Sequence, residues 1–146
     1  MTKHRSYDVA LKAARAKNPD LQKVASLLGA AHEAGDARAT YALATWYLHG
    51  KFFSKNLRKA MVLLRKAARE NVASALYDLA VSYEMGTGVA KNERKAAVLY
   101  VRAALAGDDQ SIYEASRCYY YGIGVAKDRL VARAWLDRAR EAGVDD

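Results

Sequence analysis

The hydrophobic positions of the chain follow a helical period that short glycine-containing segments interrupt. In residues 73–85, ASALYDLAVSYEM, apolar side chains recur at spacings of three and four, as on one face of a helix. Residues 86–92, GTGVAKN, are too short and too rich in glycine to form an element of their own. The helical spacing returns in residues 93–106, ERKAAVLYVRAALA. This stretch therefore predicts a helix–loop–helix unit.

The unit recurs along the chain with a constant period of 36 residues. The repeated columns include Tyr41, Tyr77 and Tyr113, then Ala60, Ala96 and Ala132, and then Gly50, Gly86 and Gly122. Internal repeats of this length indicate stacked supersecondary units. Because no stretch of useful length alternates between apolar and polar residues, the sequence predicts an all-α solenoid of about four helix pairs, hence eight helices.

We expect one domain over residues 1–146, because four helix pairs use the whole chain. Its regular repeats are expected at 37–72, 73–108 and 109–146. Residues 1–36 have the character of a degenerate unit. Its second helix, at about 20–34, keeps the register of the other repeats, whereas its first helix, at about 6–16, does not.

The loop residues are of the types that commonly end one helix and cap the start of the next. Gly86 and Gly122 follow the first helix of their repeats, where a positive φ is usual. Asn56, Asn92 and Asp128 stand where the second helix starts, and their side chains are expected to cap its free N–H groups. Phosphate binding by this loop is disfavoured, because no strand precedes the loop and it occurs three times.

These residues resemble a known family. The pattern A-x-Y-x-L-A-x-x-Y-x-x-G-x-G-V-x-x-N/D-x-x-K-A, clearest in residues 75–96, is similar to the Sel1-like repeat, a longer-looped relative of the tetratricopeptide repeat. The resemblance implies a right-handed superhelix whose first helices line the concave side, and a role in protein–protein interaction. The chain departs from the pattern at Phe52, which replaces the second loop glycine, and at Val131, which replaces the lysine.

The net charge of +8 is concentrated in one repeat. Residues 37–72 hold eight Lys and Arg against one acidic residue, which gives +7. This excess indicates either a solvated outer helix face or a landing site for an acidic partner, which would act on the association rate. Nucleic acid is a disfavoured partner, because residues 73–146 are neutral or slightly acidic.

The sequence offers little for catalysis, metal binding or membrane insertion. Three scattered histidines and one cysteine, Cys118, give no metal-ligand spacing, so we expect no cofactor and no enzymatic activity. No segment is hydrophobic enough to span a membrane, and the N-terminal residues lack the apolar core of a signal peptide. A single cysteine allows no internal disulfide, which favours a cytoplasmic location.

We therefore expect a non-enzymatic adaptor, a monomer or weak dimer, that binds one acidic protein partner through its concave helix face. An immunity protein that neutralises a cognate toxin is an alternative, and a nucleic-acid binder acting through residues 37–72 is a weaker one. The candidate partner-binding residues are Trp46, His49, Phe52, Lys55, Arg58, Asp78, Met85, Glu114, Arg117 and Tyr121. Aromatic residues, Met and Arg are enriched in interface cores. The alternatives are that Trp46 and Tyr121 fill gaps between helices and that Phe52 covers the degenerate unit.

Overall fold

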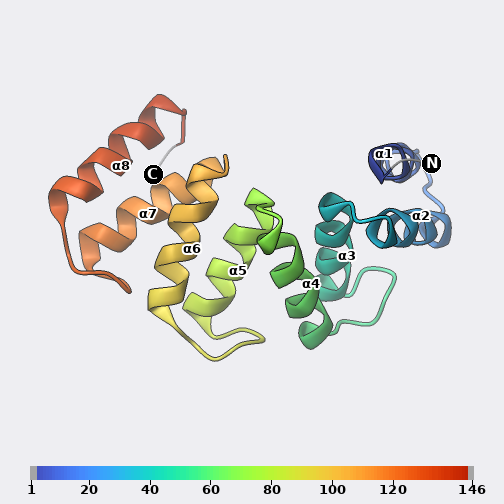
Figure 1. The fold of residues 1–146 in the computed structure, drawn as a ribbon, viewed down its shortest axis with the longest axis horizontal. Helices are drawn as coiled ribbons and strands as arrows, with labels where there is room; N and C mark the ends of the chain where they lie inside the picture. The colour runs from blue at the N-terminus through green and yellow to red at the C-terminus, as the bar shows by residue number, and fades with distance from the viewer. Residues whose placement is uncertain (1–2, 145–146) are drawn as a thin grey trace. The chain divides into compact units, whose positions relative to one another are not determined.

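The computed structural model describes residues 3–144, which form eight α-helices and no strand (Figure 1). The helices are α1 (Lys3–Ala14), α2 (Leu21–Glu33), α3 (Ala37–His49), α4 (Leu57–Arg69), α5 (Ala73–Met85), α6 (Glu93–Leu105), α7 (Asp109–Tyr121) and α8 (Arg129–Glu141). The prediction of an all-α fold built from helix pairs is confirmed.

The chain divides into two compact units, Met1–Glu70 and Asn71–Asp146. In the first unit each helix packs against its neighbour in sequence, so that α2 contacts α1 and α3, and α3 contacts α4. The second unit repeats this arrangement, with α6 between α5 and α7, and α8 against α7 (Figure 1). Each unit thus holds two helix pairs.

The helix ends confirm the roles predicted for the loop residues. Gly50, Gly86 and Gly122 close α3, α5 and α7 in the left-handed conformation, with φ of 70°, 71° and 73°. The side chains of Asn56 and Asn92 each accept a main-chain N–H hydrogen bond at 3.0 Å at the start of α4 and α6. Asp128 accepts two such bonds at the start of α8. Helices with defined ends leave few main-chain groups unsatisfied.

The N-terminal pair differs somewhat from the sequence prediction. The first helix begins and ends earlier than expected, at Lys3–Ala14 instead of about 6–16. It ends where the chain turns, the Ala16 N–H bonding to the Ala13 carbonyl at 3.4 Å. The second helix, Leu21–Glu33, lies within the predicted range and is capped by the Asp20 carboxylate.

Small residues occupy the places where helices meet. Ala60, Ala96 and Ala132, one column of the repeat, are all buried. A second column, Ala67, Ala103 and Ala139, is completely buried. A methyl group lets helix axes approach closely, since interaxial distance depends on the side chains at the crossing. The buried alanine columns therefore allow neighbouring helices to pack closely.

The loop between α7 and α8 packs tightly on the start of α6, the second helix of the preceding repeat. A Cβ at Gly124 would lie 2.0 Å from the carbonyl oxygen of Glu93, the first residue of α6. A Cβ at Gly122, in the same loop, would meet only ordinary contacts at 3.5 Å. Both glycines have positive φ, so they differ in available space and not in backbone conformation.

We predict that Gly124→Ala destabilises the protein more than Gly122→Ala. Each change places an L-residue in the left-handed region, at a cost of about 1–2 kcal/mol. Gly124→Ala adds a clash with main chain, which cannot move aside as a flexible side chain does. Urea unfolding of both variants measures the difference, and equal losses of unfolding free energy would contradict the packing of this loop.

Candidate protein-interaction surfaces

Four aromatic rings cluster at the α3–α4 loop of the first unit. Phe53 stacks on Tyr47 with ring centroids 4.6 Å apart and nearly parallel planes. Phe52 meets Phe53 edge-on at 5.0 Å and lies 6.0 Å from the Trp46 ring. Such pairs stabilise by about 0.5–1.5 kcal/mol beyond the area that they bury. The cluster therefore holds the Phe52 ring in a defined position.

Phe52 has an unusual backbone conformation for its residue type. Its φ is 61°, close to the 74° and 70° of Gly88 and Gly124 at the same place in the next two repeats. A bulky residue in the left-handed region is rare and strained. Phe52 is also 49% exposed, whereas its neighbour Phe53 packs against the core formed by α1, α2 and α3. The covering role considered for Phe52 thus belongs to Phe53.

Two cationic side chains lie over rings of the aromatic cluster, and two more are exposed nearby in sequence. The Lys51 ammonium lies 5.4 Å from the Trp46 ring centroid, and the Lys59 ammonium lies 4.6 Å from that of Tyr47. Lys55 and Arg58 are exposed at the end of the loop and the start of α4. We name the exposed side chains of Lys51, Phe52, Lys55 and Arg58 the Phe52 surface.

Two further predicted residues of the first unit lie on α3. Trp46 is only 7% exposed and belongs to the core formed by α1, α2 and α3. Its ring lies 6.0 Å from the Phe52 ring, and Trp46 itself offers little area to a partner. His49, the last residue of the helix, is exposed.

In the second unit, a hydrogen-bonded network joins α5, α6 and α7. The Arg117 guanidinium donates to both oxygens of the Glu84 carboxylate, at 2.7 and 2.8 Å, and its Nε donates to Glu114 at 2.6 Å. The Tyr100 hydroxyl donates to Glu84 at 2.7 Å. Hydrogen bonds between a guanidinium and a carboxylate are among the stronger polar interactions, because both groups are charged. Of the two residues predicted to bind a partner, Arg117 connects α7 to α5, and Glu114 holds the Arg117 side chain from the same helix.

The network shifts the titration of its members. Burial alone would raise the pKa of Glu84, but the hydrogen bonds from Arg117 and Tyr100 outweigh it and the pKa lies below its usual value. Burial raises the pKa of the Tyr100 phenol, and the neighbouring Glu84 carboxylate raises it further. Glu84 is therefore held ionised and paired.

Sequence reasoning did not identify Glu84 or Tyr100. A signal was present, since Glu84 places a carboxylate in a column that holds Leu48 and Tyr120 in the neighbouring repeats. A charge at a partly buried position needs a partner. Its partner, Arg117, lies 33 residues away, and only the packing of α7 brings them together.

The remaining predicted residues lie on α5 and α7. Met85 and Tyr121 are 69% and 64% exposed, and each directly precedes the glycine that closes its helix. The Tyr121 ring packs edge-on against Tyr120, with centroids 4.8 Å apart. Asp78 is half-buried. Met85 and Tyr121 thus present apolar area to solvent, and Asp78 presents less.

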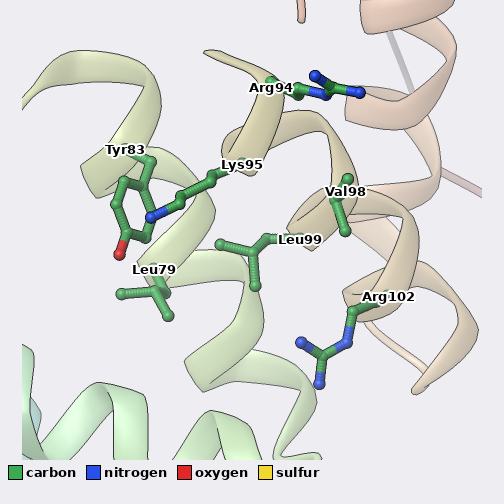
Figure 2. A pocket seen from close by; sticks show the side chains of 7 residues that line it. All are labelled: Leu79, Tyr83, Arg94, Lys95, Val98, Leu99 and Arg102. Carbon is green, nitrogen blue, oxygen red and sulfur yellow. The ribbon is translucent and has the colours of Figure 1, made fainter. Parts of the chain in front are cut away.

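A groove of about 430 Å³ lies between α5 and α6 (Figure 2). Leu79 and Leu99 form its floor, and the Lys95 ammonium lies over the Tyr83 ring, 5.3 Å from its centroid. In the repeat at 37–72, Leu43 corresponds to Leu79 and Leu63 corresponds to Leu99. Leu43 belongs to the core formed by α1, α2 and α3, and Leu63 packs against that core. The groove therefore follows a helix-packing face of the repeat.

No group of three metal-ligating side chains gathers among the described residues. Within residues 3–144, no helix combines the length and apolarity that a membrane crossing requires. Cys118 is buried, and burial raises the pKa of its thiol to about 11. A thiol in this state is a poor nucleophile at neutral pH.

Comparison with known families gives the repeat its name. A model of the Sel1 repeat matches residues 37–72, 73–108 and 109–144. The chain belongs to the Sel1 repeat family. Sel1 repeats generally mediate protein–protein interaction. Among curated proteins, none matches this chain.

Solved structures of Sel1 repeat proteins share the fold. A Sel1 repeat protein from Oxalobacter formigenes is 36% identical, covers 81% of this chain and 89% of its own, and has a TM-score of 0.77. The protein c5321, a protective antigen of uropathogenic Escherichia coli with an SLR fold, is 25% identical over 97% of this chain, with a TM-score of 0.89. This chain spans 31% of the length of c5321. Cysteine rich protein B of Helicobacter pylori is 27% identical, covers 70% of this chain and 77% of its own, and has a TM-score of 0.65.

The Glu84 network predicts how stability depends on pH. Because folding lowers the pKa of Glu84, its contribution is present above the pKa of an unfolded carboxyl and is lost as pH falls through the folded value. Arg117→Ala should cost about 2 kcal/mol, since it leaves a partly buried carboxylate without its cation. It should also raise the folded pKa of Glu84, so that acid weakens the variant at a higher pH than the wild type.

Urea unfolding between about pH 7 and about pH 3 measures both effects. Lys91→Ala is the control for the loss of one cation, because it removes an exposed pair with Glu93 at 3.5 Å and only a through-space attraction to Glu84, and exposed charges of this kind contribute little. Equal losses in the two variants would show that the network does not stabilise the unit.

Proposed function

We propose that this Sel1 repeat protein binds one protein partner through the Phe52 surface of its first unit. The observation that carries the proposal is the half-exposed phenylalanine at a left-handed position that glycine holds in the other two repeats. The strain costs about 1–2 kcal/mol. A glycine would meet the backbone requirement of the loop without this cost. The exposed ring is therefore better explained by recognition than by folding.

The surroundings of Phe52 suit it to act as an anchor. Contacts with Trp46 and Phe53 hold the ring in place before binding, which lowers the entropy lost on association. Aromatic side chains are enriched in the cores of interfaces. We expect the partner to offer an apolar hollow or knob at this point.

The charge around the ring indicates the rim of the partner. Lys51, Lys55 and Arg58 are exposed and close to Phe52 in sequence, in the repeat that carries +7. Complementary charge at an interface rim increases the association rate and disfavours wrong partners. We therefore expect an acidic partner surface around an apolar contact.

Phe52→Gly should abolish recognition with little effect on folding. Relief of backbone strain, about 1–2 kcal/mol, offsets the lost ring contacts, about 0.5–1.5 kcal/mol. The expected change in unfolding free energy is thus within about 1 kcal/mol. Peptides selected on the whole chain from a random phage-displayed library should combine acidic and apolar residues and bind Phe52→Gly at least about tenfold more weakly, a loss of about 1.4 kcal/mol.

Met85→Ala is the comparison variant, because it removes from the second unit an exposed apolar residue that the sequence predicted on the concave helix face. Selected peptides should bind it within about twofold of the wild type. If Met85→Ala weakens binding and Phe52→Gly does not, the contact surface is the exposed face around Met85 in the second unit. Peptides that bind both variants like the wild type would overturn the proposal.

The cationic residues of the Phe52 surface should affect binding kinetics differently from Phe52 itself. The double change Lys55→Glu with Arg58→Glu should reduce the association rate of the same peptides, while Phe52→Gly should mainly increase the dissociation rate. Added salt should remove most of the first effect and little of the second, because exposed charges are screened over about 10 Å at 0.1 M. Surface-binding kinetics at two salt concentrations measure this. Tighter binding of single-stranded oligonucleotides than of the peptides would instead favour a nucleic-acid partner.

A further inference from the structure

A groove of about 420 Å³ lies between α7 and α8 of the second unit. Its floor contains the buried Ala132 and Ser116, whose hydroxyl donates to the Ala132 carbonyl at 2.8 Å. Leu136 and Tyr120 add apolar area. A hollow of about 250 Å³ that shares Ser116, Tyr120 and Leu136 extends the groove towards Tyr121. The floor is thus apolar and has its polar groups satisfied.

The repeat register shows how the chain itself uses this face. Counted back by 36 residues, Ala132, Arg133, Leu136 and Arg140 correspond to Ala96, Ala97, Tyr100 and Ala104. All four of these are buried in the second unit, where α6 packs against α7. Ala104 shares a core with Ile112 of α7. The equivalent face of the preceding repeat is therefore a docking site for a helix.

Charge distinguishes the α7–α8 groove from the equivalent face of α5 and α6, which α7 covers. On the α5–α6 face the carboxylate of Glu84 receives Arg117 from the docked helix α7. On the α7–α8 face the corresponding residue is Tyr120, and three exposed arginines line the groove: Arg129, Arg133 and Arg140. Among residues 3–144, no carboxylate forms an ion pair with these arginines. A helix that docks here meets positive charge where α7 meets negative charge.

We propose that the α7–α8 groove binds an amphipathic helix of a partner protein that carries carboxylates along its apolar face. The apolar side chains would lie on Leu136 and Tyr120, and the carboxylates would reach Arg133 and Arg140. Helices that lay an apolar stripe in a groove are a common mode of recognition. Arginine pairs well with carboxylates, because its donors match the two oxygens.

A second copy of this chain fits the groove poorly. The first helix of the chain would be the stacking element of a head-to-tail pair, and its sequence carries Lys3, Arg5 and Lys12 against Asp8. A face-to-face pair would bring the arginines of two α8 helices together. Both arrangements oppose like charges, which disfavours association. The groove lies in the other unit from the Phe52 surface, so the two proposals are tested separately.

The test is fluorescence anisotropy of a designed helical peptide with leucines along one face and glutamates flanking them. The same peptide with lysines in place of the glutamates is the charge control. The double change Arg133→Ala with Arg140→Ala restores the residues of the preceding repeat, Ala97 and Ala104, so the unit should still fold. Arg94→Ala with Arg102→Ala is the matched control, since it removes two exposed arginines from α6.

We expect the glutamate peptide to bind the Arg133/Arg140 double variant about tenfold more weakly than the wild type, and the Arg94/Arg102 double variant within about twofold. Leu136→Ala should weaken binding of the same peptide without changing its dependence on salt. Circular dichroism and urea unfolding of each variant verify the fold. Amide chemical shifts that move on α7 and α8 would locate the peptide in the groove.

Three results would overturn the proposal. Equal loss of binding in the two double variants would show that only net charge matters. Equal binding of the lysine peptide would show that the arginines do not select the occupant. A dimer in light scattering that the Arg133/Arg140 change dissociates would assign the groove to a second copy of the chain.

Discussion

Close approach of neighbouring helices is the constraint on which this molecule depends. It is met by buried alanines that recur every 36 residues, such as Ala60, Ala96 and Ala132. A larger side chain at these crossings would separate the helices and remove the contacts that stabilise each pair. In two other columns, α8 carries Arg133 and Arg140 where α6 carries Ala97 and Ala104, so its face no longer suits a helix like α7. The same geometric rule thus explains both the stacking of the helices and the proposed docking groove.

The loops add a second constraint, which is backbone conformation. The helices α3, α5 and α7 each end in a left-handed glycine, and the loop that follows has a second left-handed residue two positions later. Gly88 and Gly124 meet this need without strain, and Phe52 meets it at a cost. The exception lies in the most basic repeat and is held by neighbouring rings. A local rule broken at one exposed residue is a sign of function, because folding alone gives no reason for it.

Polar residues on the helices have two different uses. Glu114 and Arg117 face the inner-helix side in a simple helical projection, and the sequence therefore suggested a partner. The structure instead pairs Arg117 with Glu84, which would otherwise be a partly buried charge without a cation, and Glu114 pairs with the same guanidinium. Pairing within the unit leaves less of their charge for recognition. Exposed apolar and cationic groups, such as Phe52 and Lys55, are more available for this purpose.

The sequence by itself determined the helices, their ends and the repeat, because these depend on local periodicity and on residues such as Gly86 and Asn92 that act on their immediate neighbours. It also singled out Phe52, since a departure from glycine is visible in an alignment of the repeats. Only the tertiary structure decided that Trp46 is buried and that Arg117 meets Glu84. Both depend on which helix faces which, and contacts between residues far apart in sequence are set by the packing of whole helices.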